Sequence, residues 1–204
     1  MLAIIDYGVG NLFSLKSSIE AIGTENVITS DPSVIKNADH IILPGVGAFG
    51  DAMDKLRSTG LDKTVIEAAA SGIPLLGICV GMQMLFTKDF EYGEHDGLDL
   101  IPGEVRDIRE IISPELKVPE IGWNSLHITK NKSKLFDGIK EGAYVYFVHS
   151  YSAVKCDKDI SALTDYSVPI TAAVESANVY GTQFHPEKSG AVGLRILENV
   201  CHIA

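Results

Sequence analysis

The segment GICVGMQ, residues 77–83, constrains the fold of this chain more than any other part of the sequence. The apolar run at 73–78 opens on isoleucine and proline, as is typical of a strand covered on both faces of a parallel sheet. Three apolar residues between 82 and 86 recur at helical spacing and predict a helix directly after the strand. Small residues two positions before and two positions after Cys79 allow such a sharp turn. The segment therefore predicts an α/β fold with Cys79 at a strand-to-helix bend.

Cys79 is the first candidate for a catalytic residue. A thiol at the start of a helix lies near the positive end of the helix dipole and near unpaired N–H groups, which favour the reactive thiolate. The backbone amide of Val80 is then expected to face the oxyanion that forms during an attack. A free cysteine is more often a small buried apolar residue without chemistry. The two flanking glycines favour the catalytic interpretation over this one.

The rest of the chain alternates between strand-like and helix-like segments. Strands are predicted at 2–6, 27–29 and 41–43, and helices at 11–22, 48–57, 61–70 and 189–201. This alternation predicts a central, mostly parallel sheet with helices on both faces and ligands beyond the carboxyl ends of its strands. After residue 89, strands at 104–108, 123–129 and 143–148 are predicted to extend the sheet antiparallel, and 97–102 to be a loop. Neither a linker nor a repeat divides the sequence, so residues 1–204 are expected to form one domain.

The composition excludes several classes of function. The chain has 204 residues and a formal net charge of −10, so it offers no basic surface for nucleic acid or for an anionic membrane. The uncharged stretch at 68–87 approaches the length of a membrane span, but its glycines and proline indicate a helix end, a strand and a helix start. Cys79, Cys156 and Cys201 are far apart and lack metal-type spacing, and the N-terminus lacks a basic signal-peptide region. These features predict a cytoplasmic protein without a metal or other cofactor.

A nucleophilic cysteine needs a base, and His185 is the strongest candidate among the six histidines. Residues 180–185 form a strand-like run, and Pro186 prevents His185 from continuing either a helix or a strand ladder. Glu187 lies two residues further on, so in an extended segment it falls on the same side and orients the imidazole ring. The alternative is an ordinary strand-to-loop turn with a solvated carboxylate.

Two other histidines are weaker candidates. His149 also ends a predicted strand, but no carboxylate follows it closely in the sequence. His95 lies between Glu94 and Asp96 in a predicted exposed loop, and no second cluster of ligands in the sequence completes a metal site with it.

The two segments that carry the main candidates resemble the signatures of class I glutamine amidotransferases: GICVGMQ at 77–83 and QFHPEKS at 183–189. Four further segments resemble the glutaminase subunits of imidazole glycerol phosphate synthases. They are DYGVGN at 6–11, LPGVGAF at 43–49, GWN at 122–124 and YFVHSY at 146–151. The resemblance spans essentially the whole chain and implies a flavodoxin-like fold.

This resemblance implies a Cys79–His185–Glu187 triad that takes ammonia from glutamine. It also implies a heterodimer with a (β/α)₈-barrel cyclase subunit, which uses the ammonia to make imidazole glycerol phosphate and an aminoimidazole carboxamide ribotide. The implied contacts of glutamine are Gly45, Gln83, Glu91, Ser150 and Tyr151. The implied residues of the partner interface are Asn11, Trp123 and Asn124. A core position is the alternative for Trp123, because so large a side chain is usually well buried.

The chemistry of such a triad needs donors for the oxyanion. The Val80 amide is one predicted donor, and the loop at 44–47 is placed to supply a second one from Val46 or Gly47. Glycines at 45 and 47 leave the intervening peptides free to adopt conformations that other residues resist. A phosphate cradle is the alternative for this loop and for the GVG at 8–10, but neither continues into a nucleotide-binding fingerprint.

Two other functions remain open from the sequence. A paralogous amidotransferase would use the same chemistry to feed another synthase, such as one that aminates a nucleotide sugar. A flavodoxin-like binding protein would keep the bend without activity, although the intact Cys79, His185 and Glu187 argue against it. Release of glutamate from glutamine separates the binding protein from the two enzymes.

Overall fold

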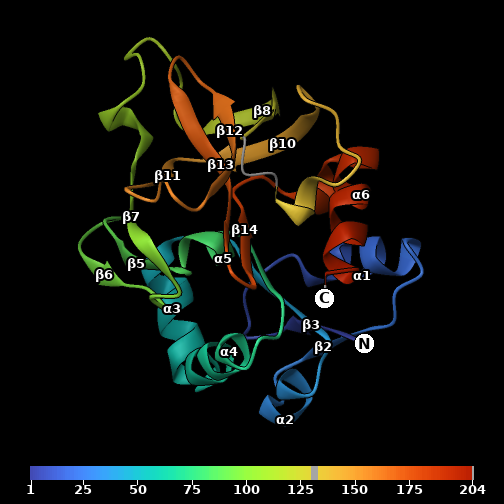
Figure 1. Cartoon of the computed structure of the whole chain (residues 1–204). Coiled ribbons are helices and arrows are strands. Elements are labelled where there is room, and N and C mark those ends of the chain that lie inside the picture. Colours follow the sequence, from blue (N-terminus) through green and yellow to red (C-terminus); the bar gives the residue numbers. More distant parts are fainter. Residues whose placement is uncertain (130–132, 204) are drawn as a thin grey trace.

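The computed structural model describes residues 1–129 and 133–203. Within them, a central sheet has the strand order β2-β1-β3-β4-β14-β13-β12-β9 (Figure 1). In this order the strands are β2 (Asn26–Thr29), β1 (Leu2–Ile5), β3 (His40–Gly45), β4 (Leu75–Cys79), β14 (Val179–Thr182), β13 (Pro169–Ser176), β12 (Ile160–Asp165) and β9 (His127–Ile128). Neighbours from β2 to β14 pair in parallel, whereas β13, β12 and β9 continue the sheet in antiparallel pairing.

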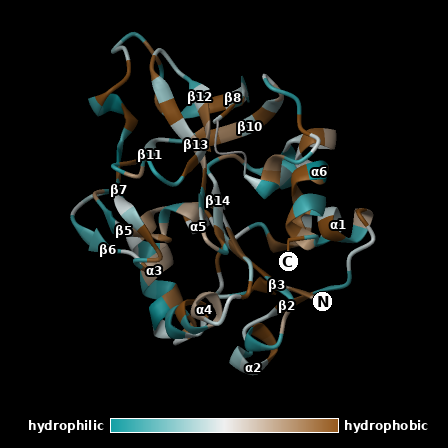
Figure 2. Cartoon of the chain, viewed as in Figure 1, coloured by the Kyte–Doolittle hydropathy of each residue, from teal (hydrophilic) through white to brown (hydrophobic). Residues whose placement is uncertain are grey.

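The parallel half consists of short apolar strands between two layers of helices. All residues of β1, β4 and β14 are buried, as expected when both faces of a sheet are covered. In Figure 1, α1 (Leu12–Ala21) and α6 (Gly190–Cys201) lie to the right of these strands, and α3 (Phe49–Ser58) and α4 (Leu61–Ala70) lie to their left. Figure 2 shows that the hydrophilic faces of the helices point away from the apolar strands. The predicted sheet with helices on both faces is confirmed.

The helices of this half begin and end close to the predicted positions. Those expected at 48–57, 61–70 and 189–201 are each observed to within one residue. The short helix α2 (Pro32–Lys36) was not predicted, although its start carries a clear signal. The Asp31 carboxylate accepts a hydrogen bond of 2.8 Å from the Ser33 N–H, and a proline occupies the first helical position.

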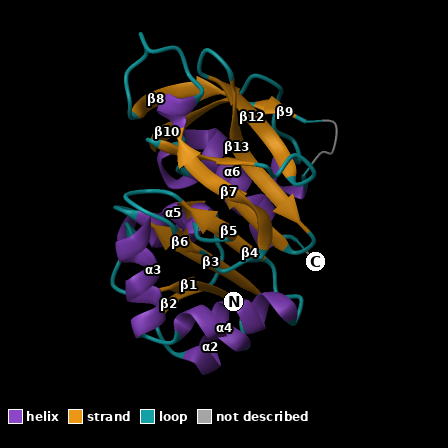
Figure 3. Ribbon diagram, turned by 90° about the vertical axis from the view of Figure 1, so that its left-hand side faces the viewer, coloured by secondary structure: helices purple, strands orange, loops and turns teal. Residues whose placement is uncertain are grey.

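The other half differs from the prediction, because six strands of the described residues lie outside the central sheet. β10 (Tyr144–His149) pairs with β8 (Glu120–Ser125) in a separate antiparallel pair. A further sheet has the order β11-β7-β5-β6. Its strands are β11 (Tyr151–Val154), β7 (Ile101–Asp107), β5 (Phe86–Asp89) and β6 (His95–Asp96). In Figure 3, β8, β10, β12 and β13 lie above the helix-covered parallel half.

The prediction that 104–108 and 143–148 extend the central sheet is therefore wrong, and within 123–129 it holds for β9 alone. The expected loop at 97–102 is also shorter, since β7 begins at Ile101. Alternating apolar residues indicate a strand, but they do not predict which strand pairs with it. Strand pairing depends on long-range packing. The sequence pattern thus predicted β7, β8 and β10 as strands but misassigned their neighbours, and it did not predict β5, β6, β11, β12 or β13.

The segments on either side of the two candidate motifs also need correction. α5 spans only Val80–Gln83, and Phe86 already begins β5. Residues 80–86 are all buried rather than buried on one side, so their spacing does not mark an amphipathic helix. The strand predicted at 180–185 ends at Thr182, and His185 instead precedes the 3₁₀ helix η3 (Pro186–Lys188).

Two more 3₁₀ helices, η1 (Ile108–Glu110) and η2 (Lys134–Phe136), lie in the connections. Across residues 1–129 and 133–203, every helix is too short or too polar to cross a membrane.

Candidate active site

The bend at Cys79 joins β4 directly to α5. Cys79 has φ 55° and ψ −114°, a backbone conformation that is costly for any residue other than glycine. The glycines two positions before and two positions after it permit this geometry because they lack side chains. A Cβ atom on Gly77 would lie 2.5 Å from the Gly81 carbonyl oxygen, and one on Gly81 would overlap the Leu43 carbonyl oxygen. The flanking glycines therefore serve the close approach of β3, β4 and α5, which holds the strained cysteine in place.

Gly45 belongs to the same close approach. A Cβ atom on Gly45 would overlap the backbone of Val80 and Gly81, so glycine is required there by contact rather than by backbone freedom. Gly47 fits the sequence interpretation better, because its φ of 86° lies in the left-handed region and no atom crowds it. The loop at 44–47 thus packs against the bend at Gly45, whereas a Cβ atom on Gly47 would meet no other atom within 4 Å.

His185 and Glu187 form a buried pair beside the bend. The Nδ1 atom of His185 lies 2.8 Å from the Glu187 Oε1 atom, and each side chain is 4% exposed. Burial lowers the pKa of the His185 imidazole, but its hydrogen bonds to Cys79 and Glu187 outweigh burial and raise this pKa from 6.5 to about 9. His185 therefore contacts the cysteine and the glutamate at once, and a protonated ring is favoured between them.

The turn that carries His185 is held by backbone and hydroxyl contacts. The His185 N–H donates to the Tyr146 carbonyl of β10 at 3.0 Å. The Ser189 hydroxyl donates to the His185 carbonyl at 2.6 Å and accepts from the Tyr146 N–H at 3.0 Å. A Cβ atom on Gly193 would overlap the Pro186 carbonyl oxygen, so α6 packs directly on this turn. The backbone turn that carries the imidazole is thereby held by β10, by Ser189 and by α6.

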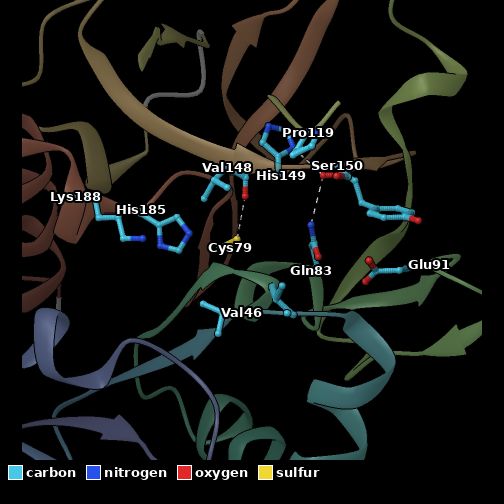
Figure 4. Close-up of a pocket in the computed structure, with 13 residues that line it drawn as sticks. Val46, Cys79, Gln83, Glu91, Pro119, Val148, His149, Ser150, His185 and Lys188 are labelled. Atoms are coloured by element: carbon cyan, nitrogen blue, oxygen red, sulfur yellow. Dashed lines mark hydrogen bonds between the residues drawn. The ribbon is translucent and has the colours of Figure 1, made fainter. Parts of the chain in front are cut away.

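A cavity of about 290 Å³ opens over Cys79 (Figure 4). Its lining contains most of the predicted site residues: Val46, Gly47, Cys79, Val80, Gln83, Glu91, Ser150, Tyr151 and His185. Pro119, Val148, His149 and Lys188 complete it. Gly45 lies outside this cavity and borders a much smaller void that also touches Asn11 and Glu187. The cavity thus gathers residues from β4, the 44–47 loop, β10, β11 and the His185 turn.

A row of polar contacts connects Gln83, which lines the cavity, with the sulfur of Cys79. The Gln83 amide nitrogen donates to the Gln183 side-chain oxygen at 3.2 Å and to the Tyr151 carbonyl at 3.4 Å. The Gln183 amide nitrogen lies 3.8 Å from the Cys79 Sγ atom, and that thiol lies 4.0 Å from the Val148 carbonyl oxygen. Sequence reasoning missed Gln183. Its position two residues before His185 was the available signal, because alternate residues of an extended segment share one side.

Glu91 is anchored at the far side of the cavity. Its Oε2 atom accepts the Phe49 N–H at 2.6 Å, at the start of α3. The Glu91 N–H donates to the Asp89 carboxylate at 2.6 Å, and burial raises the pKa of Asp89 to about 7. The Glu91 carboxylate is therefore held by a helix N-terminus, where a negative charge is favoured.

The other histidines are engaged elsewhere. His149 lines the cavity, but its Nδ1 atom lies 2.8 Å from the Tyr151 carbonyl oxygen and its Nε2 atom lies 3.1 Å from Glu120 Oε2. Neither ring nitrogen is left for Cys79. His95 is half-buried against Phe49 rather than in an exposed loop, so that expectation is wrong. Among the residues that the structure describes, no cluster of histidine, cysteine or acidic side chains could hold a metal ion.

The predicted interface residues lie at or near the surface. Trp123 is 55% exposed and packs edge-on against Tyr146 at a ring distance of 6.1 Å, so the core alternative for Trp123 is wrong. Asn11 is exposed at the start of α1. Asn124 is half-buried, and its amide nitrogen donates to Glu120 Oε1 and to the Asp165 carbonyl, each at 2.9 Å. The side chain of Asn124 therefore faces inward from β8, while Trp123 faces outward.

Comparison with known proteins follows the same pattern. Residues 3–203 match the family model described as glutamine amidotransferase class-I. The imidazole glycerol phosphate synthase subunit HisH of Wolinella succinogenes is 47% identical over 205 residues, which cover 100% of both chains. The protein of the same name from Methanothermobacter thermautotrophicus is 50% identical over 203 residues, covering 100% of this chain and 98% of the relative.

Solved structures agree with this fold. A structure titled "Crystal structure of glutamine amidotransferase" matches with a TM-score of 0.75 and 18% identity, covering 98% of each chain. The structure of PurLQS from Thermotoga maritima matches with a TM-score of 0.74 and 19% identity, covering 98% of this chain and 96% of the other. Because the sequence identity is so low, these two structural similarities are evidence for the fold alone.

Proposed function

Because the chain belongs to the class I glutamine amidotransferase family, we infer that it is the glutaminase subunit of an imidazole glycerol phosphate synthase, in histidine biosynthesis. It hydrolyses glutamine to glutamate and ammonia, and the synthase uses the ammonia. The observation that carries the chemistry is the contact of His185 with both Cys79 and Glu187 at the edge of one cavity.

We propose that the reaction proceeds through a glutamyl thioester. The Cys79 thiolate attacks the side-chain amide carbon of glutamine, which forms the C–S bond and an oxyanion. Protonated His185 gives its proton to the amide nitrogen, the C–N bond breaks and ammonia leaves. Water then gives a proton to His185 and attacks the thioester, and breakage of the C–S bond releases glutamate. Glu187 holds the ring in the required orientation throughout.

The proposed substrate contacts follow from the lining of the cavity. Gln83 is proposed to lie along the substrate amide, because Gln83 lines the same cavity as Cys79 and its amide group is held there by Gln183. Ser150 and Tyr151, at the step from β10 to β11, and Glu91 are proposed to hold the amino-acid end of glutamine. The Val80 amide and the 44–47 loop are proposed as the oxyanion donors.

We propose that the partner is a (β/α)₈-barrel cyclase subunit and that the two form a heterodimer in the cytoplasm. Ammonia that escapes into water is protonated and loses its nucleophilicity, so a sheltered interface serves the transfer. Exposed apolar side chains near the predicted interface residues support this proposal. Ile121 and Tyr144 are exposed on the same face of the β8–β10 pair as Trp123, and Phe13 is exposed on α1 close in sequence to Asn11.

The partner is also proposed to control the rate. If the resting loop presents a carbonyl where the oxyanion should lie, glutamine still binds but its transition state lacks a donor, which costs about 10² to 10³ in rate. The uncrowded Gly47 makes a peptide flip feasible. We therefore expect the partner with its ligand to raise kcat far more than it lowers KM. Full kcat in the isolated chain, or activation seen only in KM, would contradict this control.

Cys79→Ala tests the proposed function directly. The variant is expected to lose glutamine-dependent synthesis of imidazole glycerol phosphate, measured with the cyclase subunit, while synthesis from added ammonium salt continues. Only the glutaminase half-reaction needs the sulfur. Loss of both activities would overturn the assignment, and a wild-type chain that releases no glutamate with its partner would overturn the function itself.

A further inference from the structure

A second buried histidine–carboxylate pair lies next to the site and takes no part in the chemistry described so far. The Nε2 atom of His149 lies 3.1 Å from Glu120 Oε2, and the two side chains are 1% and 5% exposed. The residues stand directly opposite each other on the antiparallel strands β10 and β8. A buried pair of this kind is costly unless its remaining polar atoms are satisfied.

The hydrogen bonds of this pair are complete. The Tyr151 carbonyl can only accept, so Nδ1 of His149 carries a hydrogen and donates to it at 2.8 Å. The Nε2···Glu120 contact then needs one more proton, held by the ring or by the carboxyl group, and either placement leaves the pair without net charge. The other oxygen of Glu120 accepts from the Asn124 amide at 2.9 Å. Each polar atom of the pair therefore has a partner.

The Tyr151 carbonyl connects the pair to the reacting atoms. It accepts a hydrogen bond from His149 and a second one, at 3.4 Å, from the Gln83 amide. Gln83 in turn donates to Gln183, whose amide nitrogen lies 3.8 Å from the Cys79 sulfur. A continuous row of hydrogen bonds thus leads from β8, through the pair, to the nucleophile.

We propose that Glu120 and His149 are positioning residues for glutamine recognition. The pair fixes the Tyr151 carbonyl, and with it the Gln83 amide, in the orientation that receives the substrate. Glu120 and Asn124 face inward from β8, whereas Trp123 faces outward from the same strand. The pair therefore connects the site to the strand that carries Trp123 on its outer face. This role rests on the proposed function, since it assumes glutamine as the substrate.

The test compares variants of the full chain that break the pair in different ways. Glu120→Leu and His149→Phe each leave one polar atom of the other member buried without a partner and are expected to be unstable. The double variant replaces both with apolar groups and is expected to fold, since neither partner is left unpaired. Glu120→Gln keeps a donor for His149 Nε2 and an acceptor for Asn124, provided that the ring is neutral.

The exposed pair His127–Glu141 supplies a matched control. Its Nδ1 and Oε1 atoms are also 3.1 Å apart, but the side chains are 54% and 60% exposed and neither lines the cavity. The control is the double variant His127→Phe, Glu141→Leu. All variants are measured below their melting temperatures for glutamine turnover and for alkylation of Cys79 by chloroacetamide, which reports on the thiol without glutamine recognition.

The Glu120→Leu, His149→Phe double variant is expected to raise KM for glutamine about 10- to 100-fold, because small displacements of positioning groups have effects of this size. Alkylation of Cys79 is expected to stay within about twofold, and Glu120→Gln and the control pair to stay near the wild-type KM. A double variant with the wild-type KM would overturn the positioning role. Equal losses in turnover and alkylation would also overturn it, because they indicate a general collapse of the site. A wild-type chain without glutaminase activity would instead overturn the proposed function.

Discussion

The two buried histidine–carboxylate pairs look alike and differ in what their second ring nitrogen meets. His185 and Glu187 are 2.8 Å apart, and His149 and Glu120 are 3.1 Å apart. In the first pair the ring also contacts the Cys79 sulfur. In the second pair the ring also contacts a backbone carbonyl, that of Tyr151. We propose that the first pair serves proton transfer and the second serves orientation.

The largest expected difference is between His185→Ala and His149→Ala. Loss of the proton carrier is expected to lower kcat by at least about 10⁴-fold, as for other members of a catalytic triad. His149→Ala is expected to lower the melting temperature, because Glu120 loses its buried partner. Measured below that temperature, it is expected to cost about 10- to 100-fold in kcat/KM, because His149 acts through Tyr151 and Gln83. Steady-state glutaminase kinetics with the partner present measure both. Equal losses would erase the proposed distinction between the two pairs.

The orienting carboxylate of the first pair is the next largest test. Glu187→Gln keeps the shape of the side chain but removes its charge, and is expected to lower kcat by about 10²- to 10⁴-fold. This loss should be smaller than that of His185→Ala, because an orienting group contributes less than the proton carrier. The two variants are compared in the same kinetic assay. A greater loss for Glu187→Gln would assign the glutamate a direct part in proton transfer.

The outer face of β8 gives a smaller effect. Trp123→Ala is expected to weaken binding of the cyclase partner by about tenfold or more, since exposed tryptophans are frequent interface anchors. The melting temperature of the free chain should change little, because the side chain is 55% exposed. Calorimetric titration of the variant with the partner subunit measures the affinity. Unchanged affinity would remove Trp123 from the interface and leave β8 with an inward role only.

The smallest effect concerns stability and pH. Burial lowers the pKa of His185, but its hydrogen bonds to Cys79 and Glu187 raise the pKa by a larger amount. The net result is a rise from 6.5 to about 9. Because the folded state favours the protonated ring, this contribution to stability is complete below pH 6.5 and is lost as the pH rises through about 9. The difference in Tm between the wild type and His185→Gln should therefore narrow across this range in scanning calorimetry. A constant difference would show that folding does not raise the pKa of His185.

The sequence predicted the first pair because its geometry is local. Glu187 follows His185 by two residues, and Pro186 between them limits the backbone. Gly77 and Gly81 indicate the bend at Cys79 in the sequence. No residue with a side chain could replace either of them, because a Cβ atom there would overlap the neighbouring backbone. Gln183 was open to the same reasoning, because it precedes His185 by two residues.

The second pair could not be found in this way. Glu120 and His149 are 29 residues apart and meet only because β8 pairs with β10. The sequence of neither segment predicts that the two strands pair. The alternating pattern of 143–148 was equally compatible with a strand in the central sheet.

By itself, the sequence determined the features that depend on neighbouring residues. These are the parallel strands, most of their helices, the strained bend and the turn that sets His185 beside Glu187. Only the tertiary structure decided which strands left the central sheet and what each imidazole nitrogen meets. The physical reason is range, because backbone sterics and side-chain periodicity act over a few residues, whereas strand pairing and burial are settled by the whole chain at once.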